Sequence, residues 1–136
     1  AENDFSAAHL AECYAGRRVL LVEDDLVSQE VGRELLEEVG LHVDLADNGL
    51  DALQKISIEA YDLVFMDMQM PKMGGLETTR IIRTQSHMRG LPIIAMTANA
   101  FAEDRAQCMA AGMSDFMSKP VVPEKLYALV AKWLKP

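Results

Sequence analysis

The chain has 136 residues, a formal charge of −8 and a composition that is 50% hydrophobic. This length suits one globular domain with its own core, and the apolar content excludes a mainly disordered chain. The 13 Lys and Arg residues are scattered and outnumbered by 21 Asp and Glu, which argues against direct nucleic-acid binding, and the longest uncharged run, residues 90–102, is too short to span a bilayer.

Residues 1–16 are weakly patterned, and we predict a linker or a short frayed helix that ends at Gly16. The chain starts with Ala rather than Met and shows no apolar signal segment, which suggests a fragment excised from a longer protein. Cys13 and Cys108 lie far apart and fit no metal or redox spacing, so we expect free thiols in a reducing cytoplasm.

From Arg17 onward, short apolar runs alternate with longer amphipathic segments. Strands are predicted at the apolar runs 19–22, 41–46, 63–66, 93–96 and 113–117. Helices are predicted at 26–39, at 48–59, in a segment that ends at Arg83, at 101–111 and in a segment that begins at Pro123. In the first helix the apolar stripe is Val27, Val31, Leu35 and Val39. Strand and helix thus alternate five times, which predicts a parallel sheet covered by helices on both faces.

The distribution of apolar residues within each strand predicts the order of the strands in the sheet. The first, third and fourth runs are continuously apolar, as in strands buried on both faces. The second run alternates and the fifth is weak, as in edge strands. We therefore predict a flavodoxin-like (βα)5 doubly wound sheet with strand order 2-1-3-4-5.

Polar residues follow the strands at one edge of this predicted sheet. They are Glu23, Asp24 and Asp25 after the first strand, Asp67 after the third, Thr97 after the fourth, and Ser118 and Lys119 after the fifth. Each has an ordinary structural explanation, such as helix capping or a turn. Their shared edge, where ligands bind in such sheets, instead indicates a functional site.

The residue types at this edge predict phosphoryl-transfer chemistry. Clustered carboxylates repel one another unless a cation offsets them, and all-oxygen ligands favour Mg²⁺, with Mn²⁺ as the second candidate. Lys119 adds a mobile positive charge and Thr97 a hydroxyl donor. No Gly-rich nucleotide-phosphate loop is present, and an Asp can itself accept the phosphoryl group.

Four motifs make the chain recognisable: Val-Leu-Leu-Val-Glu-Asp-Asp at 19–25, Met-Asp-Met-Gln-Met-Pro at 66–71 with Met73-Gly74-Gly75 after it, Met-Thr-Ala at 96–98 and Ser-Lys-Pro at 118–120. Together they resemble the receiver domain of two-component response regulators over residues 17–134. The residues around Asp67 are most similar to receivers of hybrid sensor histidine kinases. We therefore predict a receiver domain at 17–136, preceded by the linker or extension at 1–16.

The resemblance implies a role for each matching residue. Asp67 would be the phosphoacceptor, Lys119 would pair with the phosphoryl oxygens, and Thr97 and Phe116 would form the conformational switch. The metal ligands would be Asp24 directly, Glu23 through water, Asp67 and the backbone carbonyl of Gln69, whereas Asp25 fills a position that is not a ligand. The Lys119–Pro120 bond would be cis. Glu23 stands where Asp is frequent, and Phe116 where Tyr is frequent, so the second departure removes a hydroxyl.

The resemblance also implies partners and a cellular setting. We expect a sensor histidine kinase or a histidine phosphotransfer domain to dock beside the first helix of the sheet domain, or on the face built from residues 99–111, 113–117 and the last helix. The domain itself would touch neither nucleic acid nor membrane, would act as a monomer or a phosphorylation-dependent dimer, and would lie in the cytoplasm. Beyond self-phosphorylation and autodephosphorylation, enzyme activity would belong to a hybrid parent kinase, which could be membrane-anchored.

Two alternatives use the same architecture. A Mg²⁺-dependent phosphohydrolase with an aspartyl nucleophile, similar to the haloacid dehalogenase family, would need a second Asp two residues after the nucleophile, and this chain has Gln69 there. A flavin or nucleotide binder would need a hydroxyl- and Gly-rich loop after the first strand, where Glu23, Asp24 and Asp25 would repel phosphate.

Overall fold

The computed structural model describes residues 7–68, 70, 73–85, 88, 90–98, 102–119 and 121–134. Within these residues the strands are β1 (Arg18–Val22), β2 (His42–Ala46), β3 (Leu63–Asp67), β4 (Ile93–Thr97) and β5 (Asp115–Ser118). The helices are α1 (Ala7–Tyr14), α2 (Leu26–Glu38), α3 (Gly49–Ile58), α4 (Gly75–Arg83), α5 (Ala102–Ala111) and α6 (Pro123–Trp133).

The strands form one parallel sheet in the order β2-β1-β3-β4-β5, which confirms the predicted topology. All five residues of β3 and of β4 are buried, whereas four of the five residues of β2 are partly or fully exposed. The difference follows from position, because a central strand is covered by helices on both faces and an edge strand is not.

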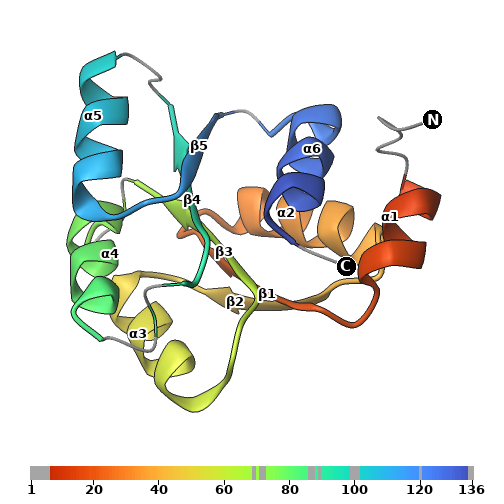
Figure 1. Ribbon diagram of the computed structural model, residues 1–136, viewed down its shortest axis with the longest axis horizontal. Coiled ribbons are helices and arrows are strands. Elements are labelled where there is room, and N and C mark those ends of the chain that lie inside the picture. Colours follow the sequence, from red (N-terminus) through yellow and green to blue (C-terminus); the bar gives the residue numbers. More distant parts are fainter. Residues whose placement is uncertain are drawn as a thin grey trace.

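Helices cover both faces of the sheet and divide the core in two. Figure 1 shows α1, α2 and α6 on one face and α3, α4 and α5 on the other. Alternate residues of β1 feed the two layers: Val19 and Leu21 pack with α2 and α6, while Leu20 and Val22 pack with α3, α4 and α5. This period of two is the geometry of an extended strand.

The apolar stripe that the sequence predicted for α2 is confirmed at Leu35 and Val39, which pack in the core, but it is wrong at its first two positions. Val27 and Val31 are 72% and 43% exposed, whereas Gln29, Gly32 and Leu36 face the sheet. A Cβ at position 32 would lie 2.8 Å from Leu21 Cδ2, so the glycine lets the helix approach β1 closely. The exposed valines are therefore available to a partner.

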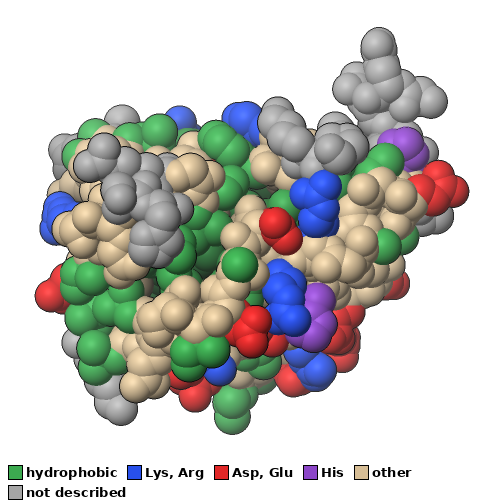
Figure 2. Space-filling model, turned by 60° about the horizontal axis from the view of Figure 1, so that its bottom comes forward, with side chains coloured by type: hydrophobic (Ala, Val, Ile, Leu, Met, Phe, Trp, Pro, Cys, Tyr) green, Lys and Arg blue, Asp and Glu red, His purple; other side chains and the backbone are tan. Residues whose placement is uncertain are grey.

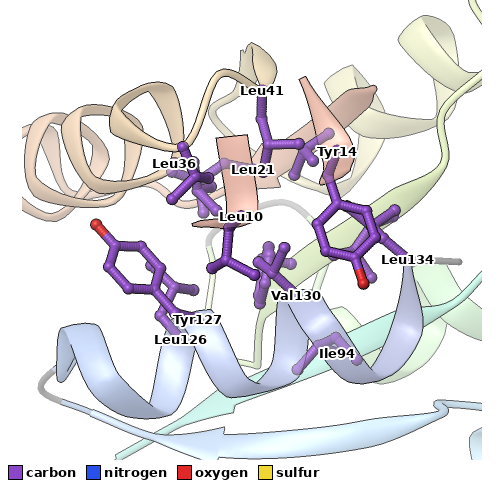
Figure 3. Packing of buried hydrophobic residues seen from close by; sticks show 14 of the residues in the cluster. Leu10, Tyr14, Leu21, Leu36, Leu41, Ile94, Leu126, Tyr127, Val130 and Leu134 are labelled. Carbon is purple, nitrogen blue, oxygen red and sulfur yellow. The ribbon is translucent and has the colours of Figure 1, made fainter. Parts of the chain in front are cut away.

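The predicted linker at 1–16 contains the helix α1, which packs on the sheet domain. Leu10 is 1% exposed and Tyr14 is buried, and both join the cluster formed by α2, α6 and the sheet (Figure 3). The Tyr14 hydroxyl donates a hydrogen bond of 3.4 Å to the Ala131 carbonyl in α6. The domain boundary at Arg17 stays a prediction.

The surface carries mixed charge. On the face shown in Figure 2, basic side chains lie next to acidic ones. Arg18, for example, lies 3.4 Å from Glu59 in an exposed ion pair. Among the described residues, none of the helices has the length and apolar content needed to cross a membrane. Cys13 and Cys108 are not joined in a disulfide, as predicted.

Candidate functional site

Carboxylates from two neighbouring strands meet at one edge of the sheet. Val22 pairs with Met66 in the β1–β3 register, so Glu23 and Asp24 lie beside Asp67. One carboxylate oxygen from each of these three residues lies within 4.8 Å of the others. Glu23 and Asp67 are buried and Asp24 is exposed, so the cluster opens to solvent on one side.

Lys119 closes the other side of the carboxylate cluster. Its Nζ lies 3.0 Å and 3.2 Å from the two carboxylate oxygens of Glu23 and 3.2 Å from Asp67 Oδ2. Its backbone N–H donates to the Thr97 carbonyl at 2.8 Å, which anchors the residue after the end of β5. The sheet thus brings together an ammonium and two carboxylates that lie far apart in sequence.

The electrostatics of the cluster favour a proton or a cation. Burial, together with the nearby Asp67 carboxylate, raises the pKa of Glu23 to about 7, and the attraction of Lys119 only partly opposes this. Burial by itself would lower the pKa of Lys119, but its contacts with Glu23 and Asp67 raise that pKa overall. One ammonium therefore does not fully balance the buried negative charge.

A cavity of about 190 Å³ lies over this cluster. Its lining comprises Glu23, Asp24, Asp25, Ser28, Asp67, Met68, Ala98 and Lys119. Carboxylate oxygens are the ligands that Mg²⁺ prefers, and the open side leaves room for further oxygen ligands. The residues present therefore fit a hard divalent cation. Gln69 and Pro120, which the sequence assigned to a metal ligand and a cis bond, lie outside the described residues.

Gly75 begins α4 directly behind Asp67, where there is no room for a side chain. A Cβ at this position would lie 2.6 Å from the Asp67 carbonyl oxygen, so any other residue would displace the end of β3. The Met68 N–H donates to the Met96 carbonyl at 3.0 Å, which continues the β3–β4 pairing past Asp67. The Asp67 backbone is therefore held on two sides.

Asp25 belongs to the helix and not to the carboxylate cluster. It is the N-cap of α2, and its Oδ2 accepts hydrogen bonds of 2.9 Å from both the Ser28 N–H and the Ser28 hydroxyl. These bonds lower the pKa of the exposed Asp25 carboxyl. The prediction that Asp25 begins the helix is confirmed.

The two predicted switch residues lie on adjacent strands. Thr97 ends β4 and is 8% exposed, while Phe116 is half-buried on β5 and pairs with Ala95. The guanidinium of Arg105, in α5, lies 4.3 Å from the centre of the Phe116 ring, a cation–π contact. Arg105 was not singled out from the sequence, because nothing local relates it to a ring eleven positions later.

The family model described as "Response regulator receiver domain" matches residues 19–131. The chain belongs to this family. The matched range holds all the side chains of the cluster, so the geometry and the family assignment concern the same site.

Similar proteins contain this receiver domain as part of larger chains. The sensor histidine kinase GacS of Pseudomonas protegens is 40% identical over 119 residues, which cover 85% of this chain and 13% of that protein. The curated relatives extend far beyond this domain, because the chain spans only 7% to 16% of their length.

Two solved structures share the fold. The receiver domain of a sensor histidine kinase from Pseudomonas aeruginosa, with a magnesium ion coordinated in its active site cleft, is 39% identical with a TM-score of 0.81, covering 88% of this chain and 98% of that one. The receiver domain of Saccharomyces cerevisiae Ssk1, crystallised with the histidine phosphotransfer protein Ypd1, is 27% identical with a TM-score of 0.82, covering 88% and 89%.

Proposed function

We propose that this receiver domain, which belongs to two-component and phosphorelay signalling, takes a phosphoryl group from a phosphohistidine onto Asp67. The observation that carries the proposal is the convergence of Asp67, Glu23 and Asp24 with the Lys119 ammonium in one solvent-open cavity. The cavity offers a nucleophile and a cation for the phosphoryl oxygens within the same few ångströms.

The transfer is a single displacement at phosphorus. A carboxylate oxygen of Asp67 forms the new P–O bond while the P–N bond to the histidine ring breaks. The electron pair of the broken bond stays on the ring nitrogen, and the ring leaves as neutral imidazole when its other nitrogen carries a proton. Lys119, already 3.2 Å from Asp67, pairs with the incoming phosphoryl oxygens.

The site would hold Mg²⁺, with Mn²⁺ as the second candidate. The ligands would come from Asp24, Asp67, Glu23 through water, and the backbone carbonyl of Gln69. When bound, the cation neutralises charge that develops on the phosphoryl oxygens. The carboxylates of the chain would hold the cation beside Asp67, where the cluster opens to solvent and a phosphodonor can enter.

The conformational response would pass through Thr97 and Phe116. A phosphoryl group on Asp67 offers a charge-assisted acceptor to the Thr97 hydroxyl. Movement of Thr97 toward it would open space beside β4 that the Phe116 ring fills, changing the surface formed by α5, β5 and α6. The phosphoryl group would shift the equilibrium between the two arrangements of Thr97 and Phe116 only to the extent that it interacts more favourably with one of them.

The partner that supplies the phosphoryl group would dock on α2, beside the carboxylate cluster. Leu26 and Val27 at the start of α2 are 74% and 72% exposed, and Val31, one turn further along the helix, is 43% exposed. A groove of about 430 Å³ beneath them shares Glu23 and Lys119 with the site. We propose that a helix bearing the phosphohistidine, from a sensor kinase or a histidine phosphotransfer domain, covers this surface.

The setting we propose is a hybrid sensor histidine kinase in which this domain lies on the cytoplasmic side. The domain would be a monomer or a phosphorylation-dependent dimer. Its net charge of −8, and the acidic side chains beside the basic ones on the face shown in Figure 2, give no support to a nucleic-acid contact. An aspartyl-nucleophile phosphohydrolase is not favoured, since residue 69 is Gln rather than the acid that such an enzyme needs.

The experiment is labelling with phosphoramidate, a small phosphodonor with a P–N bond, in the presence of Mg²⁺. Intact mass should rise by one phosphoryl group, and Asp67→Asn should abolish the gain because an amide is a poor nucleophile. Asp44→Asn is the matched control, since Asp44 lies on the edge strand β2, outside the residues that line the cavity, and its loss should leave labelling intact. Equal labelling of the parent and Asp67→Asn would refute the proposed phosphoacceptor.

A further inference from the structure

Gln29 is a buried polar residue on the face of α2 that packs against the sheet. Its side chain is 5% exposed and lies on the inward face with Gly32 and Leu36. An amide in such a place costs free energy unless it is hydrogen-bonded, whereas an apolar side chain of similar size would pack there without that requirement. The position therefore calls for a reason beyond packing.

The amide nitrogen of Gln29 bridges two loops at the functional edge of the sheet. It donates to the backbone carbonyl of Glu23 at 2.6 Å and to the carboxylate of Asp47 at 2.8 Å. Glu23 belongs to the loop between β1 and α2, and Asp47 to the loop between β2 and α3. Both N–H groups of the amide are thus used.

The Glu23 backbone is consequently held at both of its polar groups. Its N–H donates to the Ala46 carbonyl at 3.0 Å, and its carbonyl accepts from Gln29. The carbonyl belongs to the peptide unit that joins Glu23 to Asp24. Because that unit is planar, fixing its carbonyl also fixes the relative positions of the Glu23 and Asp24 Cα atoms, from which the two acidic side chains leave.

We propose that Gln29 is a positioning residue for the acidic site: it holds the Glu23–Asp24 peptide so that both carboxylates converge on Asp67 before a cation binds. The inference rests on the proposed function, in which these carboxylates hold Mg²⁺. Lys119 bridges Glu23 and Asp67, so the bond from Gln29 matters most for Asp24. Without it, the Glu23–Asp24 peptide could turn and carry Asp24 away from the other two carboxylates in the free protein, and cation binding would have to bring it back. Groups that orient metal ligands from behind commonly change metal affinity by about 10- to 100-fold.

Asp47 supplies the matched control. Asp47→Ala removes the bond between Gln29 and the second loop but leaves the bond to the Glu23 carbonyl. Gln29→Met keeps the length of the side chain and removes both bonds. If Gln29 serves only to tie the two loops together, the two variants should behave alike.

The measurement is Mg²⁺ affinity by titration calorimetry, together with the rate of phosphoramidate labelling as Mg²⁺ is varied. Gln29→Met should raise the Mg²⁺ dissociation constant about tenfold and the half-saturating Mg²⁺ concentration equally, and Asp47→Ala should change both less than about twofold. The labelling rate at saturating Mg²⁺ should stay near the parent value, since a bound cation itself gathers the carboxylates. A loss of folding would instead lower the labelling rate at saturating Mg²⁺ together with the Mg²⁺ affinity.

A second variant and a second readout guard against misfolding. Gln29→Glu retains the shape of the side chain but cannot donate when ionised, and it should weaken Mg²⁺ binding in the same direction. In metal-free protein, ¹⁵N relaxation at Glu23 and Asp24 should show more motion in Gln29→Met than in Asp47→Ala. Parent-like Mg²⁺ affinity in both Gln29 variants would overturn the positioning role alone, whereas a parent protein that binds no Mg²⁺ would overturn the proposed function as well.

Discussion

Truncating Leu10 tests whether α1 belongs to the folded domain. The family match begins at residue 19, and the sequence places the domain boundary at Arg17, yet Leu10 is 1% exposed against α6 and the sheet (Figure 3). Leu10→Ala replaces a buried isobutyl group with a methyl group and leaves a cavity between α1 and the cluster that contains Val130 and Leu134. We expect a measurable loss of global stability.

The magnitude follows from burial and from the position of the helix at the end of the chain. Leu-to-Ala changes in cores lower the free energy of unfolding by about 2–5 kcal/mol. The lower part of that range applies here, because an eight-residue terminal helix relieves a costly cavity by shifting or detaching. A loss of about 2–3 kcal/mol should lower Tm by roughly 8–12 °C in a domain of this size.

Thermal unfolding of the metal-free domain, followed by circular dichroism, measures the effect. Glu12→Ala is the control, since Glu12 is exposed on the same helix and its loss should change stability by less than about 0.5 kcal/mol. If Leu10→Ala and Glu12→Ala unfold at the same temperature as the parent, α1 is not docked in solution. The linker interpretation of residues 1–16 would then hold.

Three further predictions concern the site and its surroundings. Because the pKa of Glu23 is raised to about 7, Mg²⁺ must displace a proton from this carboxyl at lower pH. Mg²⁺ affinity measured by calorimetry should therefore fall by up to about tenfold for each pH unit below that value. Glu23→Gln should remove this pH dependence. Val27→Asp should slow phosphoryl transfer from a phosphorylated histidine phosphotransfer protein but not from phosphoramidate, while Ile58→Asp, at an equally exposed position on α3, should slow neither. Arg105→Ala should release the Phe116 ring and enlarge the population of the activated state in metal-free protein. The increase should be about two- to fivefold, because the cation–π contact is worth roughly 0.5–1 kcal/mol. The β5 amide chemical shifts should then move toward their beryllofluoride-bound positions, and unchanged shifts would contradict the prediction.

The sequence alone was sufficient for the architecture and for the location of the chemistry. The length and texture of the apolar runs reflect how each strand is covered, so they predicted the strand order that the structure has. Parallel strands end at a common edge, so the residues after β1 and β3 had to be neighbours. The convergence of Glu23, Asp24 and Asp67 follows from these two local facts.

Local patterns were insufficient wherever two apolar surfaces competed or a polar group was buried. The valines of α2 form a helical stripe as regular as a core stripe, yet Val27 and Val31 face solvent because Gly32 allows the opposite side to approach β1. The orientation of α2 that exposes these valines also buries Gln29, and no sequence period distinguishes a buried glutamine from an exposed one. Its two hydrogen bonds exist only because β1 and β2 end side by side.

The contacts that complete the site and the domain join distant parts of the chain. Lys119 meets Glu23 96 residues away, and Leu10 belongs to a core cluster that also contains Leu134, near the other end of the sequence. A short segment such as α1 lacks enough apolar surface to fold alone, so its sequence is indistinguishable from that of a linker. Residue order and periodicity determined the sheet and the position of its acidic edge. The tertiary structure decided which side chains are paired, buried or left for partners, because those outcomes depend on surfaces supplied by other elements.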